Sequence, residues 1–216
     1  MLDFKNKKII VVIAHPDDET IGCGGLISKA ARLGAEVKVI LPLKRRNQRT
    51  ESDWGEEIKE FKDACALLGA APVLLEHLVV DDYIELKVEE IANKLAEYVS
   101  WADLIFCHHF NDIHHAHQAI SKAVEIATRP FRINKTVFCF EILTSTDQGF
   151  ESGFKPNCYV VLGEEDAAKK ENAMKLYKTE NVRGRTSKNL NNLMKYRGGQ
   201  IGTNFAEAFQ IVRFYI

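Results

Sequence analysis

The chain has 216 residues, of which 46% are hydrophobic and 27% charged, and its formal net charge at pH 7 is -1. This is typical of a globular protein with one large core, and the near-neutral charge gives no support for a nucleic-acid or membrane-surface partner. The N-terminus leads into only a short apolar run, so we expect neither a signal peptide nor a membrane span. Five scattered cysteines without a CxxC pair favour a reducing compartment and a cytoplasmic location.

Strands and helices alternate along the first two-thirds of the chain. Apolar runs predict strands at Lys8–Ala14, Glu36–Leu41, Val73–Leu78, Asp103–Cys107, Thr136–Ile142 and Cys158–Leu162. Apolar residues at helical spacing predict helices at Thr20–Leu33, Gly55–Leu68, Lys87–Val99, His117–Ala127 and Glu165–Tyr177. The remainder is polar over Lys178–Gln200 and apolar over Phe205–Tyr215. We expect one α/β domain over residues 1–216, with a doubly wound, mostly parallel, Rossmann-like sheet, helices on both faces and the strand order 3-2-1-4-5.

The polar stretch from Pro42 to Trp54 predicts a long loop at the end of the second strand, and such loops are often functional. It contains the basic residues Arg45, Arg46 and Arg49. The simpler interpretation places them on a solvated surface. The alternative is that they contact an anionic group of a substrate.

The first predicted strand ends in an acidic string, AHPDDE, at Ala14 to Glu19. His15 and Asp18 stand three residues apart, so an imidazole and a carboxylate can converge on one divalent ion while the carboxylate of Asp17 stays available. By itself the pattern is weak, because an aspartate in this place is also a common helix N-cap.

The fourth predicted strand runs into the stretch HHFNDIHHAH at 108–117, which holds five of the seven histidines. If strands 1 and 4 are neighbours, the two loops face each other outside the carboxyl ends of the sheet, where such folds bind ligands. Zinc in catalytic sites takes three His, Asp or Glu ligands and a water. His15, Asp18 and one histidine of the second loop supply this set, and Asp17 is then the candidate general base.

Two histidines of the second loop, His114 and His117, are also three residues apart. One would bind the metal, and the other, protonated, would stabilise an oxyanion and protonate a leaving nitrogen, with Asp112 orienting it. A second interpretation is that a histidine-dense loop is only a surface feature. His108, His109 and His115 are assigned to loop structure or pocket lining.

The glycines Gly22, Gly24 and Gly25 suggest a dinucleotide site, but their spacing is not GxGxxG and acidic residues precede them. Close packing of the following helix against the sheet explains them more simply.

These motifs resemble the LmbE/PIG-L family of zinc-dependent N-deacetylases. The string Ala14–Glu19 stands entire and is followed by the family's Gly-x-Gly-Gly, and the family's NDxHPDH is matched by NDIHHAH at 111–117. Weaker matches lie at Ala64-x-x-x-Leu68-Gly69 and at Gly202-x-x-x-Ala206-Glu207-x-Phe209.

The resemblance implies an LmbE-type fold with zinc, or another divalent transition metal, on His15, Asp18 and His117. It also implies that Asp17 is the general base and that His114 steadies the tetrahedral intermediate. Asp112 would hold His114, and Glu19 would be a structural acid behind the ligands.

The chain departs from the family pattern in two places. His115 and Ala116 replace the family's Pro-Asp, which removes a carboxylate near the histidine pair. An arginine that many members of the family place early in the helix ending at Leu68-Gly69 is absent, with Glu56 and Glu57 in its vicinity, and Arg45, Arg46 or Arg49 would serve in its place.

The activity that the resemblance implies is removal of an acetyl or other acyl group from the nitrogen of an amino sugar or a sugar conjugate. The partner is then a small N-acyl sugar or glycoconjugate, with residues 1–145 carrying both motifs and residues 146–216 capping the substrate, helped by a neighbouring subunit if a homo-oligomer forms. Two alternatives remain: a metal-dependent ester or phosphoester hydrolase, and a non-catalytic sugar- or metal-binding member of the fold.

Overall fold

The computed structural model describes residues 3–44, 51–80, 87–150, 153–178 and 184–215. The strands are β1 Lys8–Val12, β2 Glu36–Lys44, β3 Ala71–Val80, β4 Leu104–His108, β5 Thr136–Phe140, β6 Cys158–Leu162 and β7 Phe205–Arg213. The helices are α1 Asp18–Arg32, α2 Glu51–Leu68, α3 Val88–Lys94, α4 Ala96–Trp101, α5 His115–Ala127, α6 Glu164–Met174 and α7 Ser187–Gly199, with a short 3-10 helix, η2, at Thr146–Gln148.

The strands form one seven-stranded sheet in the order β3-β2-β1-β4-β5-β7-β6. β1 to β5 are parallel, which confirms the predicted α/β fold and its order 3-2-1-4-5. β1 lies inside the sheet, with Val11 opposite Val39 of β2 and Phe106 of β4. β7 runs antiparallel between β5 and β6, so the C-terminal stretch completes the sheet.

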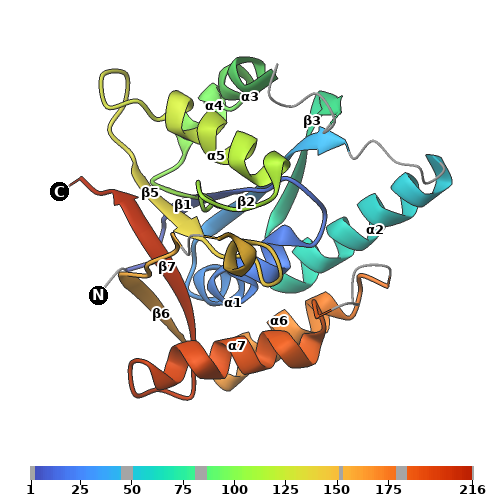
Figure 1. The fold of residues 1–216 in the computed structure, drawn as a ribbon, viewed down its shortest axis with the longest axis vertical. Helices are drawn as coiled ribbons and strands as arrows, with labels where there is room; N and C mark the ends of the chain where they lie inside the picture. The colour runs from blue at the N-terminus through green and yellow to red at the C-terminus, as the bar shows by residue number, and fades with distance from the viewer. Residues whose placement is uncertain (1–2, 45–50, 81–86, 151–152, 179–183, 216) are drawn as a thin grey trace.

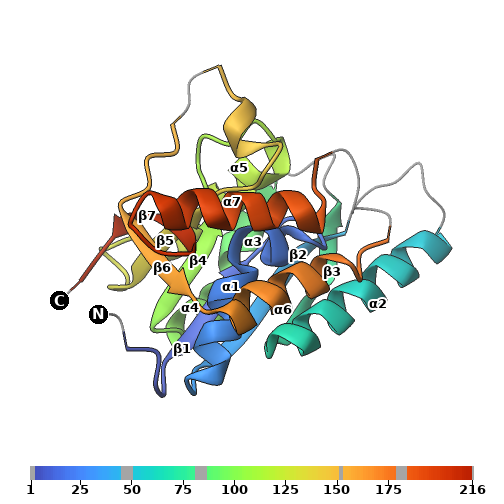
Figure 2. The ribbon, with the colours of Figure 1, turned by 90° about the horizontal axis from the view of Figure 1, so that it is seen from below.

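Two layers of helices cover the sheet: α3, α4 and α5 lie on one face, and α1, α2, α6 and α7 lie on the other (Figures 1 and 2). Ile9 and Val11 of β1 belong to the core beneath α1, whereas Ile10 and Val12 belong to the core beneath α5. Because both faces are buried, the strand is an uninterrupted apolar run rather than an alternating one.

Several element boundaries differ from the predictions. β2 runs on to Lys44 and α2 begins at Glu51, so both extend into the stretch predicted as a loop. The helix predicted over Lys87–Val99 is α3 followed by α4, joined at Leu95, which keeps right-handed helical backbone angles. α7 was not predicted at all.

α7 has an N-terminal cap and an apolar stripe that explain its formation. The Thr186 hydroxyl accepts the Asn189 N–H at 3.2 Å, and Leu190 and Met194, four residues apart, are buried. Two apolar residues among many polar ones are too short a pattern to predict a helix from the sequence.

The glycines at the start of α1 allow the helix to lie close to the sheet, as predicted. A Cβ atom on Gly22 would stand 2.4 Å from Phe140 Cδ2, and one on Gly25 would stand 2.4 Å from Leu162 Cδ1. Any larger residue would push the N-terminal half of α1 away from the strands.

A buried ion pair between Lys170 of α6 and Glu207 of β7 holds α1 through hydrogen bonds to its backbone. Glu207 accepts the backbone N–H groups of Gly25 and Leu26 at 2.8 and 2.7 Å, and Lys170 Nζ donates to the Ile21 carbonyl at 2.7 Å and to Glu207 at 2.6 Å. In a regular helix the Gly25 N–H donates to the Ile21 carbonyl. The pair thus gives each of these two helix groups a partner from outside the helix.

α6 also contacts the second half of α1 through Asp166. This buried carboxylate accepts the Ser28 hydroxyl at 2.9 Å and the Arg32 guanidinium at 2.7 Å. We call Asp166, Lys170 and Glu207 the α1 clamp, because all three hold α1 through polar contacts.

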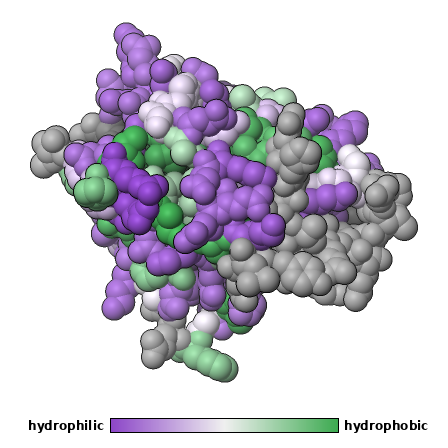
Figure 3. Space-filling model, turned by 90° about the horizontal axis from the view of Figure 1, so that it is seen from above, coloured by the Kyte–Doolittle hydropathy of each residue, from purple (hydrophilic) through white to green (hydrophobic). Residues whose placement is uncertain are grey.

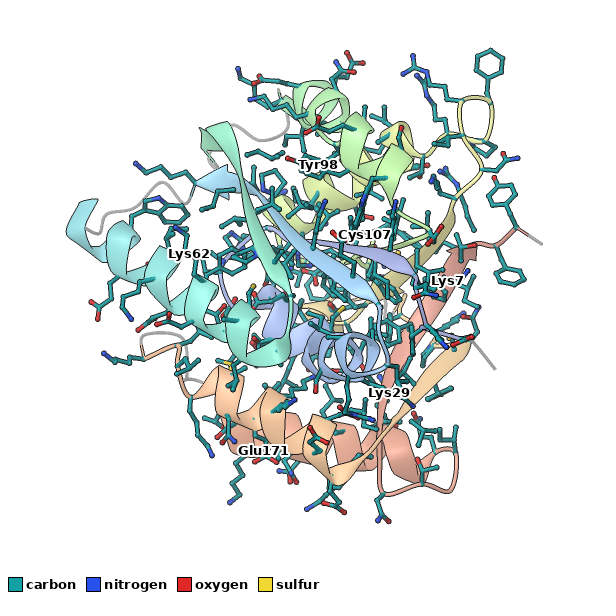
Figure 4. The ribbon with its side chains drawn as sticks, turned by 180° about the vertical axis from the view of Figure 1, so that it is seen from behind. Lys7, Lys29, Lys62, Tyr98, Cys107 and Glu171 are labelled. Carbon is teal, nitrogen blue, oxygen red and sulfur yellow. The ribbon has the colours of Figure 1, made fainter. Side chains whose placement is uncertain are left out.

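The surface of the molecule is more polar than its interior. Figure 3, which views the side of α3 to α5, shows purple hydrophilic residues over most of the surface with green hydrophobic residues between them. In Figure 4, Cys107 of β4 lies in the interior, whereas Lys62 of α2 and Glu171 of α6 lie on outer helices. All five cysteines are free thiols. Among the helices described, none combines the length and apolar character needed to cross a bilayer.

Candidate metal centre

The two predicted loops meet at the carboxyl ends of β1 and β4. These strands are parallel neighbours, with Val12 opposite Cys107, so the segments that follow them leave the sheet side by side. His117 Nε2 lies 3.5 Å from Asp18 Oδ1. The sheet order therefore brings together the histidine and aspartate that the sequence predicted to share a site.

The acidic string makes a strained turn into α1. Asp17 is the N-cap residue at φ 105° and ψ -28°, and its side chain makes no capping hydrogen bond. A non-glycine residue at positive φ costs about 1–3 kcal/mol and is typical of functional sites. Since Asp18 is already inside the helix and Asp17 does not cap it, helix capping does not explain the two aspartates.

The carboxylate of Asp18 is fully buried, and its two oxygens have different surroundings. Oδ2 accepts the N–H groups of Ala14 and His15 at 3.2 and 2.7 Å, and it lies 3.2 Å from His108 Nε2. Oδ1 has no hydrogen-bond partner among the described residues and faces His117. Burial alone would raise the pKa of Asp18, but His117 and His108 outweigh it and hold the pKa well below the ordinary value. One oxygen is thus anchored, and the other is directed into the site.

His117 is held by Asp112. Its Nδ1 lies 3.1 Å from Asp112 Oδ1, and Asp112 also accepts the hydroxyls of Ser145 and Thr146. Burial and nearby His108 lower the pKa of His117 to about 3, so the ring is neutral at pH 7. Donation from Nδ1 to Asp112 leaves the Nε2 lone pair facing Asp18, which is the carboxylate–histidine arrangement that orients metal ligands.

Asp112 was expected to hold His114, and in the structure it contacts the backbone of this residue rather than its ring. Its carboxylate accepts only the backbone N–H of His114, at 2.8 Å, while the ring contact goes to His117. The reason is the start of α5 at His115, two residues earlier than predicted. His114 is then the N-cap residue, and its Nδ1 accepts the Ala116 N–H at 3.2 Å.

The N-cap role sets the chemistry of His114. An Nδ1 that accepts a hydrogen bond carries no proton, so the neutral ring carries its proton on Nε2. Burial and the neighbouring His15 lower the pKa of His114 to about 4. The ring is therefore neutral at pH 7, whereas the sequence predicted a protonated one, and it presents a neutral N–H donor instead.

His15 completes the cluster from the first loop. Its Nδ1 lies 3.6 Å from Asp18 Oδ2, and its ring centroid lies 4.8 Å from that of His114 and 5.4 Å from that of His117. Among the described residues, two groups of side chains have possible ligand atoms close enough to share an ion, and both include His117: His15, His114 and His117, and Asp18, His108 and His117.

The spacing of two candidate ligand atoms fits a divalent metal. Two atoms bound to one tetrahedral zinc at about 2.0–2.1 Å lie roughly 3.3 Å apart. Asp18 Oδ1 and His117 Nε2 lie 3.5 Å apart, and the first of these is the buried oxygen without a hydrogen bond.

Glu19 contacts the backbone of Asp17. Its Oε1 accepts the hydroxyls of Thr20 and Tyr177 at 2.5 and 2.6 Å, and its Oε2 accepts the Asp17 N–H at 3.3 Å. Burial raises the pKa of Glu19 to about 7. Glu19 thus stabilises the backbone of the strained residue rather than entering the site.

Two site residues were missed by the sequence analysis. His108 had been assigned only to loop structure or pocket lining, yet it is fully buried and packs its ring on His117 at a centroid distance of 4.0 Å. Its position at the end of β4, beside the end of β1, was a usable signal. Arg185 Nη1 lies 3.4 Å from Asp17 Oδ2 and comes from a distant segment that carried no local signal. Arg45, Arg46 and Arg49 lie outside the described residues.

Comparison with known proteins places both site loops in one family. The profile of the PIG-L family, described as GlcNAc-PI de-N-acetylase, matches residues 10–128, more than half of the chain. Among curated proteins, none matched the sequence.

Three solved structures illustrate the shared fold. The N,N'-diacetylchitobiose deacetylase from Pyrococcus horikoshii is 19% identical, with a TM-score of 0.72 over 95% of this chain and 84% of that one. The zinc-inhibited form of teicoplanin deacetylase Orf2 is 15% identical, with a TM-score of 0.75 over 94% and 97%. The 4-carboxy-2-hydroxymuconate hydratase GalB from Pseudomonas putida KT2440 is 17% identical, with a TM-score of 0.72 over 97% and 98%. At such identities the likeness shows the fold, which also carries a hydratase.

Proposed function

The chain belongs to the PIG-L (LmbE) family, and from that premise we propose that it is a zinc-dependent hydrolase that removes an acetyl or other acyl group from the nitrogen of an amino sugar or sugar conjugate. The observation that carries the proposal is the divided carboxylate of Asp18. Protein donors anchor Oδ2, while buried Oδ1 has no hydrogen bond among the described residues and faces the Nε2 of neutral His117. Such an oxygen is a costly feature unless a cation binds there.

We assign His15, Asp18 and His117 as the metal ligands, and the hydrogen bonds support this choice. His114 is disfavoured because its neutral tautomer has a proton on Nε2. His108 is disfavoured because its Nε2 accepts the Ala14 N–H at 3.1 Å and lies 3.2 Å from Asp18 Oδ2, so the protein already uses that atom. His108 instead packs its ring on the proposed ligand His117.

The bound zinc would polarise the acyl carbonyl and lower the pKa of the attacking water to about 7. Asp17, next to the ligand Asp18, is the base that takes the proton of the water and passes it to the departing amine nitrogen. Since the Nε2–H of His114 is a neutral donor in a partly buried site, it stabilises the oxyanion of the tetrahedral intermediate by hydrogen bonding. This requires no charge on the ring at pH 7.

The proposed partner is a small N-acyl sugar or glycoconjugate, with residues 146–216 capping it. The chitobiose and teicoplanin deacetylases share the fold, and their names support a sugar-linked amide as the substrate class. The free thiols support the proposed cytoplasmic setting. Formation of a homo-oligomer stays a prediction.

The test is a joint measurement of metal content and acetate release. Purified protein is loaded with substoichiometric to equimolar zinc, because the neighbouring Orf2 has a zinc-inhibited form. It is then assayed on a panel of N-acetyl amino sugars and sugar conjugates and on generic phosphoesters. We expect acetate release from at least one N-acetyl sugar.

Variants assign the roles. Asp17→Asn is expected to keep the metal and lose about 10³-fold in kcat, whereas His15→Ala and His117→Ala lose both metal and activity. Asp147→Asn, an exposed aspartate near the same loops, is the matched control and should change neither. An undiminished Asp17→Asn would refute the base assignment. Bound zinc without any acetate release favours a non-catalytic sugar- or metal-binding protein. Hydrolysis of phosphoesters alone favours a metal-dependent ester or phosphoester hydrolase.

A further inference from the structure

Arg185 reaches the proposed base from the far end of the chain. Its Nη1 lies 3.4 Å from Asp17 Oδ2 although 168 residues separate the two in sequence, and its Nε donates to Thr144 Oγ1 at 3.0 Å. The guanidinium therefore joins three segments: the turn before α1, the loop after β5, and the residues just before α7.

The backbone around Arg185 is anchored on both sides. Gly184 has φ +96°, and the Asn189 side chain donates to its carbonyl at 3.0 Å. A Cβ on Gly184 would stand 3.0 Å from Thr144 Cγ2, so the segment lies close against the loop after β5. On the other side, Thr186 caps α7. The backbone that carries Arg185 is therefore held in place on both sides of the residue.

The loop that receives Arg185 also supports the metal ligands. Thr144 has φ +70°, which is an outlier for a β-branched residue, and the next two residues, Ser145 and Thr146, donate to Asp112 behind His117. Strained backbone at Thr144 and at Asp17 therefore flanks the Arg185 contact on both sides. Such strain persists only where the surrounding structure over-determines it, and it clusters at active sites.

The charges at this contact are complementary and unequal in exposure. The Asp17 side chain is fully buried, whereas the Arg185 side chain is 22% exposed, so the guanidinium approaches from the outer side of the site. Guanidinium stays protonated at every working pH and presents its donors in a rigid plane, which fixes the direction of a carboxylate better than an ammonium does.

We propose that Arg185 is a positioning residue that holds Asp17 Oδ2, so that the carboxylate stays directed at the attacking water. The proposal rests on the function proposed above for Asp17. It makes the segment before α7 part of the catalytic arrangement, and not only a cap over the substrate. The reaction then depends on a contact made by the last third of the chain, outside residues 10–128 that match the family profile.

The test compares Arg185→Met and Arg185→Lys in the full-length, zinc-loaded protein, with acetate release, KM and bound metal measured for each. Arg185→Met is expected to lower kcat about 10²-fold, with bound zinc unchanged and KM within about threefold, because misdirecting a catalytic group costs turnover more than ground-state binding. Arg185→Lys should recover about tenfold of the loss. Added guanidinium ion should partly restore Arg185→Met but not Asp17→Asn. Arg132→Met, an exposed arginine before β5, is the control.

Three outcomes would overturn the proposal. An unchanged kcat in Arg185→Met would show that Asp17 needs no such contact. A KM raised tenfold at constant kcat would make Arg185 a substrate contact, and loss of zinc would make it a support of the metal ligands. If Arg185→Met does not fold, the test rests on Arg185→Lys. A reduced kcat with unchanged bound zinc and KM in Arg185→Lys supports the proposal, and an unchanged kcat overturns it. Wild-type protein that hydrolyses none of the panel overturns the proposed function itself, before any variant is compared.

Discussion

Helix α1 contacts two sets of buried polar groups, one at its N-terminal end and the α1 clamp along its length, and the two sets are organised in opposite ways. At the N-terminal end, Asp17 has a strained backbone, and Asp18 and His108 each have a buried atom without a hydrogen bond among the described residues. Along the rest of the helix, the α1 clamp pairs Lys170 with Glu207, both within hydrogen-bond distance of further partners.

This difference in hydrogen bonding distinguishes residues that are arranged to bind a ligand from residues that stabilise the fold. A buried charge that is fully paired and hydrogen-bonded holds elements in register, and loss of one partner is costly. Groups that are left partly unsatisfied reduce stability and are retained where a ligand completes them. We therefore expect substitutions at the N-terminal end of α1 to remove activity, and those in the clamp to remove stability.

The largest expected effect is on activity at the N-terminal end. Asp18→Asn is expected to lose zinc binding and at least about 10³-fold in turnover, because the ligand oxygen loses its charge. The metal-free variant should lose less stability than a clamp variant, because asparagine keeps an acceptor oxygen for the N–H groups of Ala14 and His15. Acetate release measures the turnover, and urea unfolding in the presence of a chelator measures the free energy of unfolding of the metal-free protein. A loss of stability above about 3 kcal/mol would place Asp18 with the clamp residues.

The clamp is expected to show the reverse. Lys170→Met leaves Glu207 buried and unpaired, so the free energy of unfolding should fall by about 3–5 kcal/mol. The neighbouring Lys169 makes a partly exposed ion pair with Glu165 at 3.2 Å. Lys169→Met should therefore change the free energy of unfolding by less than about 0.5 kcal/mol. Urea titration of both variants gives the comparison. Equal effects at the two lysines would mean that burial of the pair does not matter.

Metal binding should stabilise the folded chain through one end of α1 only. At a free zinc concentration 100 times the dissociation constant, the free energy of unfolding should rise by about 2.7 kcal/mol. The rise should vanish in His117→Ala and persist in Lys170→Met, although the latter is less stable overall. Thermal unfolding with and without zinc measures it. A zinc effect that survives in His117→Ala would require other ligands.

Much of the fold was predictable because its signals are local. β1, β4 and β5 are apolar runs buried on both faces, and the order of β1 to β5 follows from right-handed crossovers between parallel strands. The meeting of the two site loops followed from that order. The insertion of β7 between β5 and β6 was not predicted, because an apolar stretch alone does not show which strand it pairs with.

The details of the site depended on contacts that sequence spacing does not encode. Asp112 contacts the ring of His117 but only the backbone N–H of His114, because α5 begins two residues earlier than the apolar spacing suggested. Tyr177 and Arg185 reach the acidic string across 158 and 168 residues. Glu207 stood in a motif that the sequence analysis had noted, but its role needed the position of Lys170.

The smallest effect that we predict concerns the edge of the clamp at Asp166. Burial tends to raise the pKa of this carboxyl, but Arg32 and Ser28 outweigh it, so the pKa in the folded chain lies below the ordinary value. A lowered carboxyl pKa stabilises the fold above the unfolded-state pKa, about 4, and the contribution is lost as pH falls below it. Because the Arg32 side chain is 40% exposed, solvent weakens the pair to about 1 kcal/mol.

Asp166→Asn tests this sign. The difference in unfolding free energy between wild type and Asp166→Asn should be constant from about pH 5 to pH 8 and should shrink as the pH falls below about 4. Asp63→Asn, which removes an exposed pair with Lys59 at 2.6 Å, is the matched control and should leave the free energy of unfolding nearly unchanged. A difference that grows with acid would mean that Asp166 is protonated in the folded chain. The clamp would then hold α1 at this point through a neutral carboxyl, and only Lys170 and Glu207 would remain as its charged part.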